Sequence, residues 1–208
     1  DGHTIKDIIT RGPRDIDFIS AGSSVDGLNN LTLEQIHFLV HKIDELNSMY
    51  DFIIIDTGAG ISDQVMEFVA SSSEIILVTT PEPTSITDSY SLLKALYKRK
   101  NFVPDNSRIK IIANKVTSRD DANIVYNKIN SVVMQFLKGK LEYLGYIPSD
   151  ASVERAVRQQ QIVSICEPFS KASRAYDDIA EKLLGNEATQ NTVKKSIAHI
   201  FSSFLKKQ

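Results

Sequence analysis

The stretch that decides the fold lies at residues 51–63 and reads Asp51-Phe52-Ile53-Ile54-Ile55-Asp56-Thr57-Gly58-Ala59-Gly60-Ile61-Ser62-Asp63. Its apolar run lacks the polar alternation of a half-exposed strand, so it predicts a central parallel strand that is covered on both faces. Such a strand ends at the carboxyl edge of the sheet, where open α/β folds bind ligands. We therefore expect Asp56 and the loop after it to form part of a ligand site.

The chemistry of this loop suits a magnesium ion and a phosphate. Asp56 is too polar to end a buried strand without a partner, and Gly58 and Gly60 allow the backbone to approach a phosphate closely or to adopt a positive φ. The alternative is that Asp56 only caps the next helix while the glycines form a turn. Strand-Asp-Gly loops are common in this fold class, so the neighbouring segments must decide.

Length and composition bound the possibilities. A chain of 208 residues suffices for one well-buried α/β domain and is short for two. The formal net charge of −2 provides no strong field for nucleic acid, so we expect no sequence-specific nucleic-acid partner. The single cysteine, Cys166, excludes an intramolecular disulfide and is expected to be a structural thiol. The sequence contains neither a run of about 18 apolar residues nor a secretory signal, which indicates a cytoplasmic protein.

Strand-like and helix-like segments alternate along the chain, which predicts a three-layer α/β fold whose mostly parallel sheet has helices on both faces. The expected strands span 16–20, 52–55, 74–80, 109–113 and 141–147, and the apolar run at 75–78 predicts that the third of them is buried. The expected helices span 32–50, 63–69, 84–97, 120–138, 151–160 and 167–184. Gly185-Asn186 is expected to end the last of these. We therefore predict a domain over residues 1–185, a linker over 186–191 and an amphipathic helix over 192–208.

Four loops follow successive predicted strands, at 56–62, 79–87, 114–119 and 148–153. The carboxyl ends of parallel strands share one edge of a sheet, so these loops are expected to converge on one site. Taken alone, Asn114 would be a simple turn residue at a strand end. Together with the other loops it is a candidate ligand residue. Arg155 and Arg158, one turn apart on the helix after the last loop, are expected either to be exposed or to line a dimer or partner surface.

The four loops carry sequence motifs that resemble one family. The motifs are Asp-Thr-Gly-Ala-Gly-Ile-Ser at 56–62, Thr-Thr-Pro-Glu-Pro-Thr-Ser-Ile-Thr-Asp at 79–88, Asn-Lys-Val at 114–116 and Glu-Tyr-Leu-Gly-Tyr-Ile-Pro-Ser-Asp at 142–150. They resemble the MinD/ParA family of deviant P-loop ATPases, and over residues 1–184 they are most similar to its FlhG subfamily, which regulates the number and placement of flagella. The Thr-Pro-Glu-Pro-Thr-Ser block is far more specific than a lone glycine loop.

The resemblance implies a role for each motif, with ATP or ADP and magnesium as cofactors. Asp56 resembles the Walker B aspartate, which holds Mg²⁺ through an ordered water. Gly58, Ala59 and Gly60 resemble the switch II loop that senses the γ-phosphate. Asn114, followed by Lys115, matches the asparagine that hydrogen-bonds adenine. The loop that flanks the base is matched by Pro148, Ser149 and Asp150.

One element of the family is missing from these residues. No Gly-x-x-x-x-Gly-Lys-[Ser/Thr] motif occurs, nor the family's Lys-Gly-Gly-x-Gly-Lys version. Family order puts the phosphate loop and the water-positioning aspartate before residue 1, so we expect an amino-terminally truncated chain with no catalytic residue of its own and no ATP hydrolysis. The alternatives are a MinD-like division-site ATPase, a ParA-like positioning ATPase, or a non-catalytic interaction module of this fold.

The end of the chain carries a second pattern. Apolar residues recur at helical spacing between lysines: Val193, Ile197, Ile200, Phe201, Phe204 and Leu205. This resembles the membrane-targeting helix of the MinD group and implies a peripheral location at the inner face of the cell membrane. The alternative is an ordinary final helix. The resemblance also implies an ATP-bound homodimer, and as partners the SRP-like flagellar GTPase FlhF and the flagellar switch-complex proteins.

Overall fold

The computed structural model describes residues 5–20, 32–104 and 108–188, and its contacts divide the chain into two compact units. The first unit contains the described residues up to Ser71, and the second contains those from Ser72 onward. The single domain expected over residues 1–185 stays a prediction, as do the linker and the terminal helix. The six apolar residues of the membrane segment, from Val193 to Leu205, lie outside the described residues.

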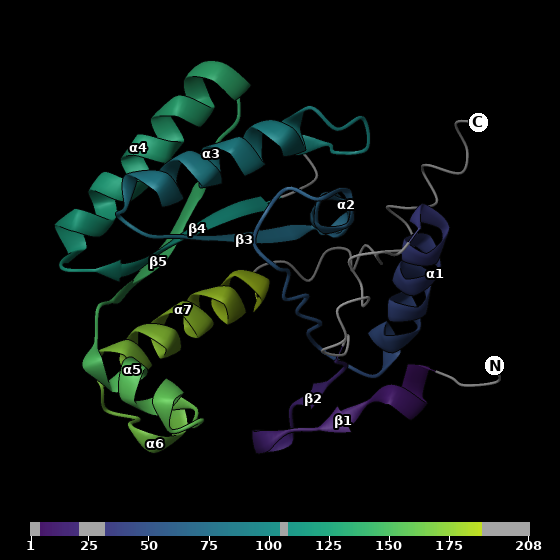
Figure 1. Ribbon diagram of the computed structural model, residues 1–208, viewed down its shortest axis with the longest axis horizontal. Helices are drawn as coiled ribbons and strands as arrows, with labels where there is room; N and C mark the ends of the chain where they lie inside the picture. The colour runs from purple at the N-terminus through teal and green to yellow at the C-terminus, as the bar shows by residue number, and fades with distance from the viewer. Residues whose placement is uncertain (1–4, 21–31, 105–107, 189–208) are drawn as a thin grey trace. The chain divides into compact units, whose positions relative to one another are not determined.

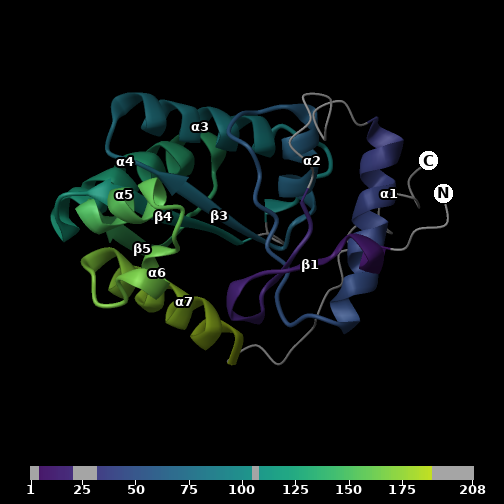
Figure 2. The same ribbon diagram turned by 60° about the horizontal axis from the view of Figure 1, so that its bottom comes forward.

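The second unit is built on a parallel sheet in the order β3-β4-β5. Its strands are β3 (Glu74–Thr79), β4 (Arg108–Val116) and β5 (Glu142–Pro148), and its helices are α3 (Pro83–Tyr97), α4 (Arg119–Leu137), α5 (Ala151–Arg158), α6 (Val163–Cys166) and α7 (Lys171–Ala188). Figure 1 shows α3 and α4 on one face of the sheet and α7 on the other, and Figure 2 shows the same layers from another side. The predicted three-layer α/β fold is confirmed.

Apolar side chains fill both faces of this sheet. Between the sheet and the α3–α4 layer, the most buried are Leu93, Leu96, Ile111, Ile129, Val133 and Leu141. On the α7 side a second cluster contains Ile112, Leu144, Ile147, Ala172 and Ile179. The central strand is buried without interruption from Ile109 to Ala113, as expected for a parallel strand covered on both faces.

Only one face of β3 is buried, although its sequence reads as a buried strand. Ile75, Leu77 and Thr79 are buried, whereas Ile76 and Val78 are 43% and 52% exposed. β3 lies at the edge of the described sheet and pairs with β4 alone. The helices that contact it cover one face, so its apolar run is half buried.

A network of charged side chains lies at the amino ends of the three strands. The Arg108 guanidinium lies 3.3 Å from a Glu74 oxygen and 3.0 Å from a Glu142 oxygen. The hydrogen bonds from Arg108 lower the pKa of Glu142. Lys110 is 1% exposed, and its Nζ lies 2.5 Å from Glu74 Oε1. This contact is an ion pair that lacks the alignment of a hydrogen bond, and a buried ammonium needs such a counter-charge.

The first unit contains short elements and two helices. They are η1 (Ile5–Ile8), β1 (Thr10–Arg11), η2 (Pro13–Asp15), β2 (Asp17–Phe18), α1 (Leu33–Asp44), η4 (Glu45–Ser48) and α2 (Asp63–Ser71). Thr32 and Gln35 form a capping box at the start of α1, because the side chain of each accepts a hydrogen bond from the other's backbone N–H. The strand expected over 16–20 shrinks to the two residues of β2, which pair antiparallel with β1.

The prediction of a strand over residues 52–55 is wrong. Residues 52–58 adopt no helix or strand, Phe52 is 49% exposed, and Ile54 is 88% exposed. A parallel strand needs a neighbour with which to exchange hydrogen bonds. Within the described part of the first unit the only strands are β1 and β2, which pair with each other, so the apolar run has no partner strand there.

Two glycines of the second unit have opposite surroundings. A Cβ on Gly145 of β5 would lie 3.0 Å from Ile179 Cγ1, so this glycine allows α7 to pack against the strand. Gly185 has nothing within 4 Å of such a Cβ. It was expected to end α7, but the helix continues through it to Ala188. A glycine inside a helix costs only about 1 kcal/mol relative to alanine.

Gly145→Val should lower the free energy of unfolding by about 2 kcal/mol, because the added branches overpack the β5–α7 contact. Gly185→Ala is the matched control and should raise it by about 0.5 kcal/mol through helix propensity. Urea unfolding of the full chain, followed by circular dichroism, measures both changes. A Gly145→Val protein as stable as the wild type would contradict the close packing of α7 on β5.

Candidate functional site

The carboxyl edge of the β3-β4-β5 sheet gathers three of the four predicted loops. Because the strands are parallel, the loops that begin after Thr79, Val116 and Pro148 leave the same edge. The fourth loop, 56–62, belongs to the first unit. The second unit thus contains Asn114 and residues 148–150, which are predicted to contact the base. The predicted magnesium and switch residues belong to the first unit.

The loop after β3 is fixed by Ser85, near the start of α3. Its hydroxyl accepts a hydrogen bond from the Thr80 backbone N–H at 3.1 Å and lies 3.1 Å from the buried Thr79 hydroxyl. The Thr80 side chain, the backbone N–H of Glu82 and the charge of Lys115 lower the pKa of Glu82. Lys115 lies near the carboxyl end of β4, so charge complementarity connects the loop after β3 with the end of β4.

At the end of β4 a β-bulge sets the direction of Asn114 and Lys115. The pairing with β5 shifts between Asn114 and Val116, and Lys115 has a left-handed φ of 55°. Bulges of this kind re-aim side chains at sheet edges. Asn114 Oδ1 accepts a hydrogen bond from the Lys115 N–H at 2.9 Å. Among the described residues, none accepts from Asn114 Nδ2, so this donor is available to an acceptor such as a ring nitrogen of a base.

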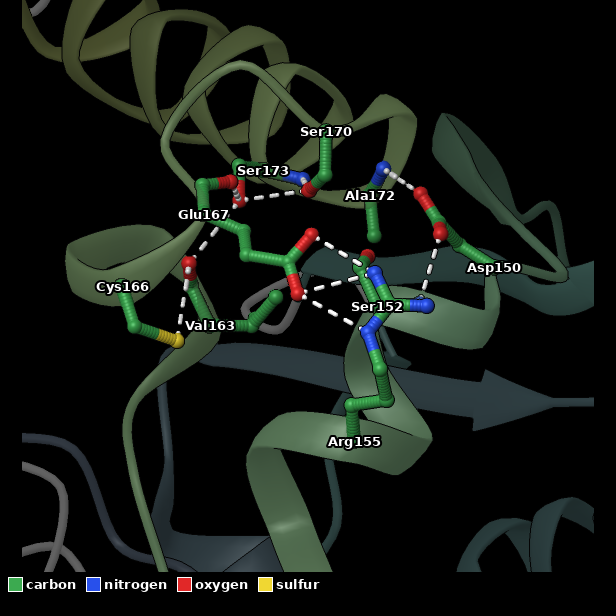
Figure 3. Close-up of polar contacts among 9 residues, drawn as sticks. All are labelled: Asp150, Ser152, Arg155, Val163, Cys166, Glu167, Ser170, Ala172 and Ser173. Atoms are coloured by element: carbon green, nitrogen blue, oxygen red, sulfur yellow. Dashed lines mark hydrogen bonds and ion pairs between the residues drawn. The ribbon is translucent and has the colours of Figure 1, made fainter. Parts of the chain in front are cut away.

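The loop after β5 connects the sheet to α5 and α7. The Ser149 N–H donates to the Val116 carbonyl at 2.9 Å, which ties the ends of β4 and β5 together. Asp150 caps two helices. Its Oδ1 accepts from the Ser152 N–H at 2.9 Å at the start of α5, and its Oδ2 accepts from the Ala172 N–H at 3.1 Å at the start of α7 (Figure 3). Both carboxylate oxygens are therefore engaged structurally.

These hydrogen bonds lower the pKa of Asp150 to about 2. The Ser152 side chain is the largest cause, followed by the backbone N–H groups of Ser152 and Ala172. The Ser152 hydroxyl nevertheless makes no well-aligned hydrogen bond, so the backbone donors are the interactions that the geometry supports. That Asp150 also flanks a bound base stays a prediction.

A second set of polar contacts stabilises the corner where α5, α6 and α7 meet (Figure 3). Arg155 donates to both carboxylate oxygens of Glu167, at 2.9 and 2.8 Å. Ser173 Oγ donates to the Glu167 carbonyl at 2.8 Å and lies 3.3 Å from the Val163 carbonyl. Of the two arginines left open by the sequence, Arg155 is exposed, with 57% of its side chain accessible, and is held by its ion pair with Glu167. Arg158 is exposed and lies 4.0 Å from Glu154.

The loop with Asp56 is exposed throughout residues 56–61. The helix that follows it is capped by Ser62, whose Oγ accepts from the Val65 N–H at 3.4 Å, so Asp56 is not needed as a cap. Gly60 has a φ of 121°, which side chains rarely adopt. Gly58, Ala59 and Gly60 therefore form an accessible loop with one position that requires glycine. Within the described residues, no three His, Cys, Asp or Glu side chains gather as a metal site.

The roles of two of these positioning residues, Ser85 and Glu167, were not predicted from the sequence. Ser85 was read only as the start of a helix, although a serine directly after Thr-Pro-Glu-Pro-Thr is placed to bond back to the loop. No sequence pattern predicts the role of Glu167, because its ion-pair partner, Arg155, lies 12 residues away in the sequence. Cys166 is exposed and so does not belong to the core, as a structural thiol would.

Comparisons with known proteins agree with this arrangement. No protein-family model matches the chain. The chain is 34% identical over 179 residues to the antiactivator FleN of Pseudomonas aeruginosa. The aligned region covers 86% of this chain and 62% of FleN. It is 32% identical over 143 residues to the flagellum site-determining protein YlxH of Helicobacter pylori, covering 68% and 47% of the two chains. The chain thus spans less than two thirds of the length of either relative.

Solved structures show the same fold. A ParA family ATPase from Chlorobium tepidum matches with a TM-score of 0.65 at 26% identity, over 86% of this chain and 67% of that one. The septum site-determining protein MinD of Pyrococcus horikoshii, complexed with Mg-ADP, has a TM-score of 0.65 at 20% identity, over 92% and 73%. The second likeness shows the fold alone.

The parallel sheet with helices on both faces, together with these matches, shows the α/β fold of the P-loop class. More narrowly, the chain belongs to the MinD/ParA family of ATPases.

Asp150→Asn should lower the free energy of unfolding at pH 7 by about 1 kcal/mol, since an amide cannot accept from both helix termini. The folded pKa of Asp150 lies below its unfolded value. The stabilisation is therefore complete above about pH 4 and is lost as the pH falls from about 4 to 2. Urea unfolding at several pH values should show the difference from wild type disappearing over that range.

The control is Asp177→Asn, at an exposed position of α7, which should change stability by less than about 0.5 kcal/mol at every pH. An Asp150→Asn deficit that is as large at pH 2 as at pH 7 would contradict the double cap.

Proposed function

We propose that this chain is part of an ATP-dependent switch protein of the FlhG type, which regulates the number and placement of flagella. The observation that carries the proposal is the 34% identity to FleN over 86% of the chain. The similarity to YlxH supports the same function. A MinD-like or ParA-like positioning ATPase is the alternative within the family.

In this proposal each loop has a nucleotide-related task. Asp56 binds Mg²⁺ through a water, and Gly58, Ala59 and Gly60 register the γ-phosphate. Asn114 hydrogen-bonds adenine with its unengaged amide group, while Lys115, Pro148, Ser149 and Asp150 flank the base. The Mg-ADP in the MinD structure supports ATP or ADP with Mg²⁺ as the ligands. The ATP-bound form is a homodimer.

A non-catalytic binding module is the second candidate. It would keep this fold without a phosphate-binding loop, and no Gly-x-x-x-x-Gly-Lys-[Ser/Thr] sequence occurs within the 208 residues given. Phosphoryl transfer depends mainly on positioned positive charge around the phosphates. Without the amide cradle and its lysines, these residues supply binding and sensing groups only.

The purified 208-residue chain should therefore bind an adenine nucleotide and hydrolyse none. Asn114→Ala should weaken the binding of a fluorescent ADP analogue about tenfold, which is the loss expected for one hydrogen bond to a base. Asn127→Ala, at an exposed position of α4, should leave it unchanged. Steady ATP turnover that Asp56→Ala abolishes would contradict the expected inactivity, and equal affinity in the Asn114 and Asn127 variants would contradict the base site.

The α3–α4 layer offers a surface for a protein partner. A hollow of about 470 Å³ lies between the two helices and is lined by Tyr90, Lys94, Tyr97, Lys98, Phe136 and Leu137. Phe136 is 63% exposed, and neither Lys94 nor Lys98 forms an ion pair with a described residue. No Asp or Glu occurs in residues 89–104 or 122–141. A hollow lined by aromatic side chains and lysines suits a partner segment that is acidic and that inserts one apolar side chain.

We assign this α3–α4 hollow to the flagellar switch-complex proteins; the GTPase FlhF is the other partner that the FlhG resemblance implies. Phe136→Ala should weaken binding of the switch-complex partner about tenfold by removing a central anchor. Lys98→Glu should weaken it further and reduce its salt dependence. Isothermal titration calorimetry with the partner measures both, with Phe169→Ala as the matched control. Unchanged affinity in the Phe136 variant would exclude this surface.

The membrane contact is proposed from sequence alone. Residues 192–208 combine an apolar stripe with flanking lysines, and each basic residue near anionic lipid contributes about 1 kcal/mol. None of the described helices has the length and apolarity needed to cross a bilayer. Removal of residues 190–208 should abolish flotation with anionic liposomes, as expected of a protein that binds the inner face of the cell membrane through this segment. Equal flotation of both forms would refute the membrane contact.

A further inference from the structure

The corner formed by α5, α6 and the turn before α7 exposes a group of large apolar side chains. We call it the α5–α6 corner and define it by four residues whose exposed fractions are 68%, 49%, 42% and 83%: Val157, Ile162, Ile165 and Phe169. A single exposed apolar residue needs no explanation. Four within 13 residues of one structural corner indicate an interaction surface.

The backbone beneath this corner is firmly held, so the exposure is not that of a loose loop. Arg155 and Glu167 join α5 to the end of α6 by a two-pronged ion pair, and Ser173 joins α7 to the Glu167 carbonyl. Asp150 fixes the starts of α5 and α7 relative to each other. A pre-organised surface binds at a lower entropic cost than a mobile one.

The charges on the outer face of α5 indicate which partner fits. Glu154 and Arg158 are one helical turn apart, beside Val157, and their side chains are 75% and 81% exposed. At 4.0 Å they form only a weak pair within one chain. Two antiparallel α5 helices related by a two-fold axis would place each Glu154 opposite the Arg158 of the other copy. The α3–α4 hollow has cations alone and cannot complement itself in this way.

We propose that the α5–α6 corner is a self-association surface, on which a second copy of this chain docks by antiparallel pairing of the two α5 helices. Val157 lies near the two-fold axis, two Glu154–Arg158 pairs flank it, and the other three apolar residues enlarge the contact. An isologous contact requires such self-complementarity. The pairing needs no nucleotide, so it is separate from the ATP-bound homodimer proposed above.

Sedimentation velocity of the nucleotide-free full chain at low salt tests the pairing. Wild-type protein should show a concentration-dependent monomer–dimer equilibrium. Glu154→Arg and Arg158→Glu should each raise the dissociation constant about tenfold, because each sets like charges opposite one another twice. The double variant Glu154→Arg/Arg158→Glu restores opposite charges across the axis and should return the dissociation constant to within about threefold of wild type.

Two aromatic variants separate this surface from the α3–α4 hollow. Phe169→Ala should weaken self-association, and Phe136→Ala should leave it unchanged. Circular dichroism confirms that each variant is folded. A wild-type chain that stays monomeric at every concentration overturns the proposal, as does a double variant that associates as weakly as the single ones. Neither result bears on nucleotide binding, which the Asn114 experiment tests.

Discussion

The parallel pairing of β4 with both of its neighbours is the interaction on which the second unit depends. Ile109 pairs with Ile75 on one side, and Ile111 pairs with Tyr143 on the other. Parallel strands require long crossover connections, which α3 and α4 supply on one face of the sheet. All three strands therefore end at one edge, and this edge receives Ser85, Asn114 and Asp150 from three separate loops. The position of the candidate ligand site follows from the direction of the strands before any side chain is considered.

The second unit could be predicted well from the sequence, because its elements carry local signals that packing then reinforces. The β4 region reads as a buried apolar run and forms a strand buried on both faces. The residues at 52–55 carry an equally strong apolar signal and form no strand. A strand is not a property of its own residues alone, since its hydrogen bonds belong to a neighbour. The sequence pattern at 52–55 predicts the need for burial but cannot supply the neighbour.

The site residues differ in the same way. The sequence leaves Asn114 as either a turn residue or a base ligand. In the structure its Oδ1 accepts a hydrogen bond at the bulge and its amide group has no described acceptor, so the turn role does not exclude the proposed one. Asp150 followed by Ser152 carries the sequence signature of a helix cap, so its first hydrogen bond could be foreseen. Its second, to Ala172, could not, because that contact crosses 22 residues and depends on how α7 packs on β5.

The charged network at the opposite edge of the sheet has a consequence for this geometry. The apolar side chains of β3, β4 and β5 would tolerate a slip of two residues, since such a slip keeps each side chain on its own face. It would also separate Glu74 from Arg108 and leave the buried Lys110 ammonium without its counter-charge, at a cost of several kcal/mol. The network of ion pairs thus helps to determine the pairing register of the three strands. Charges at the amino ends of the strands help to set the register in which Thr79 pairs with Ala113, and Pro148 with Val116, at the candidate ligand edge.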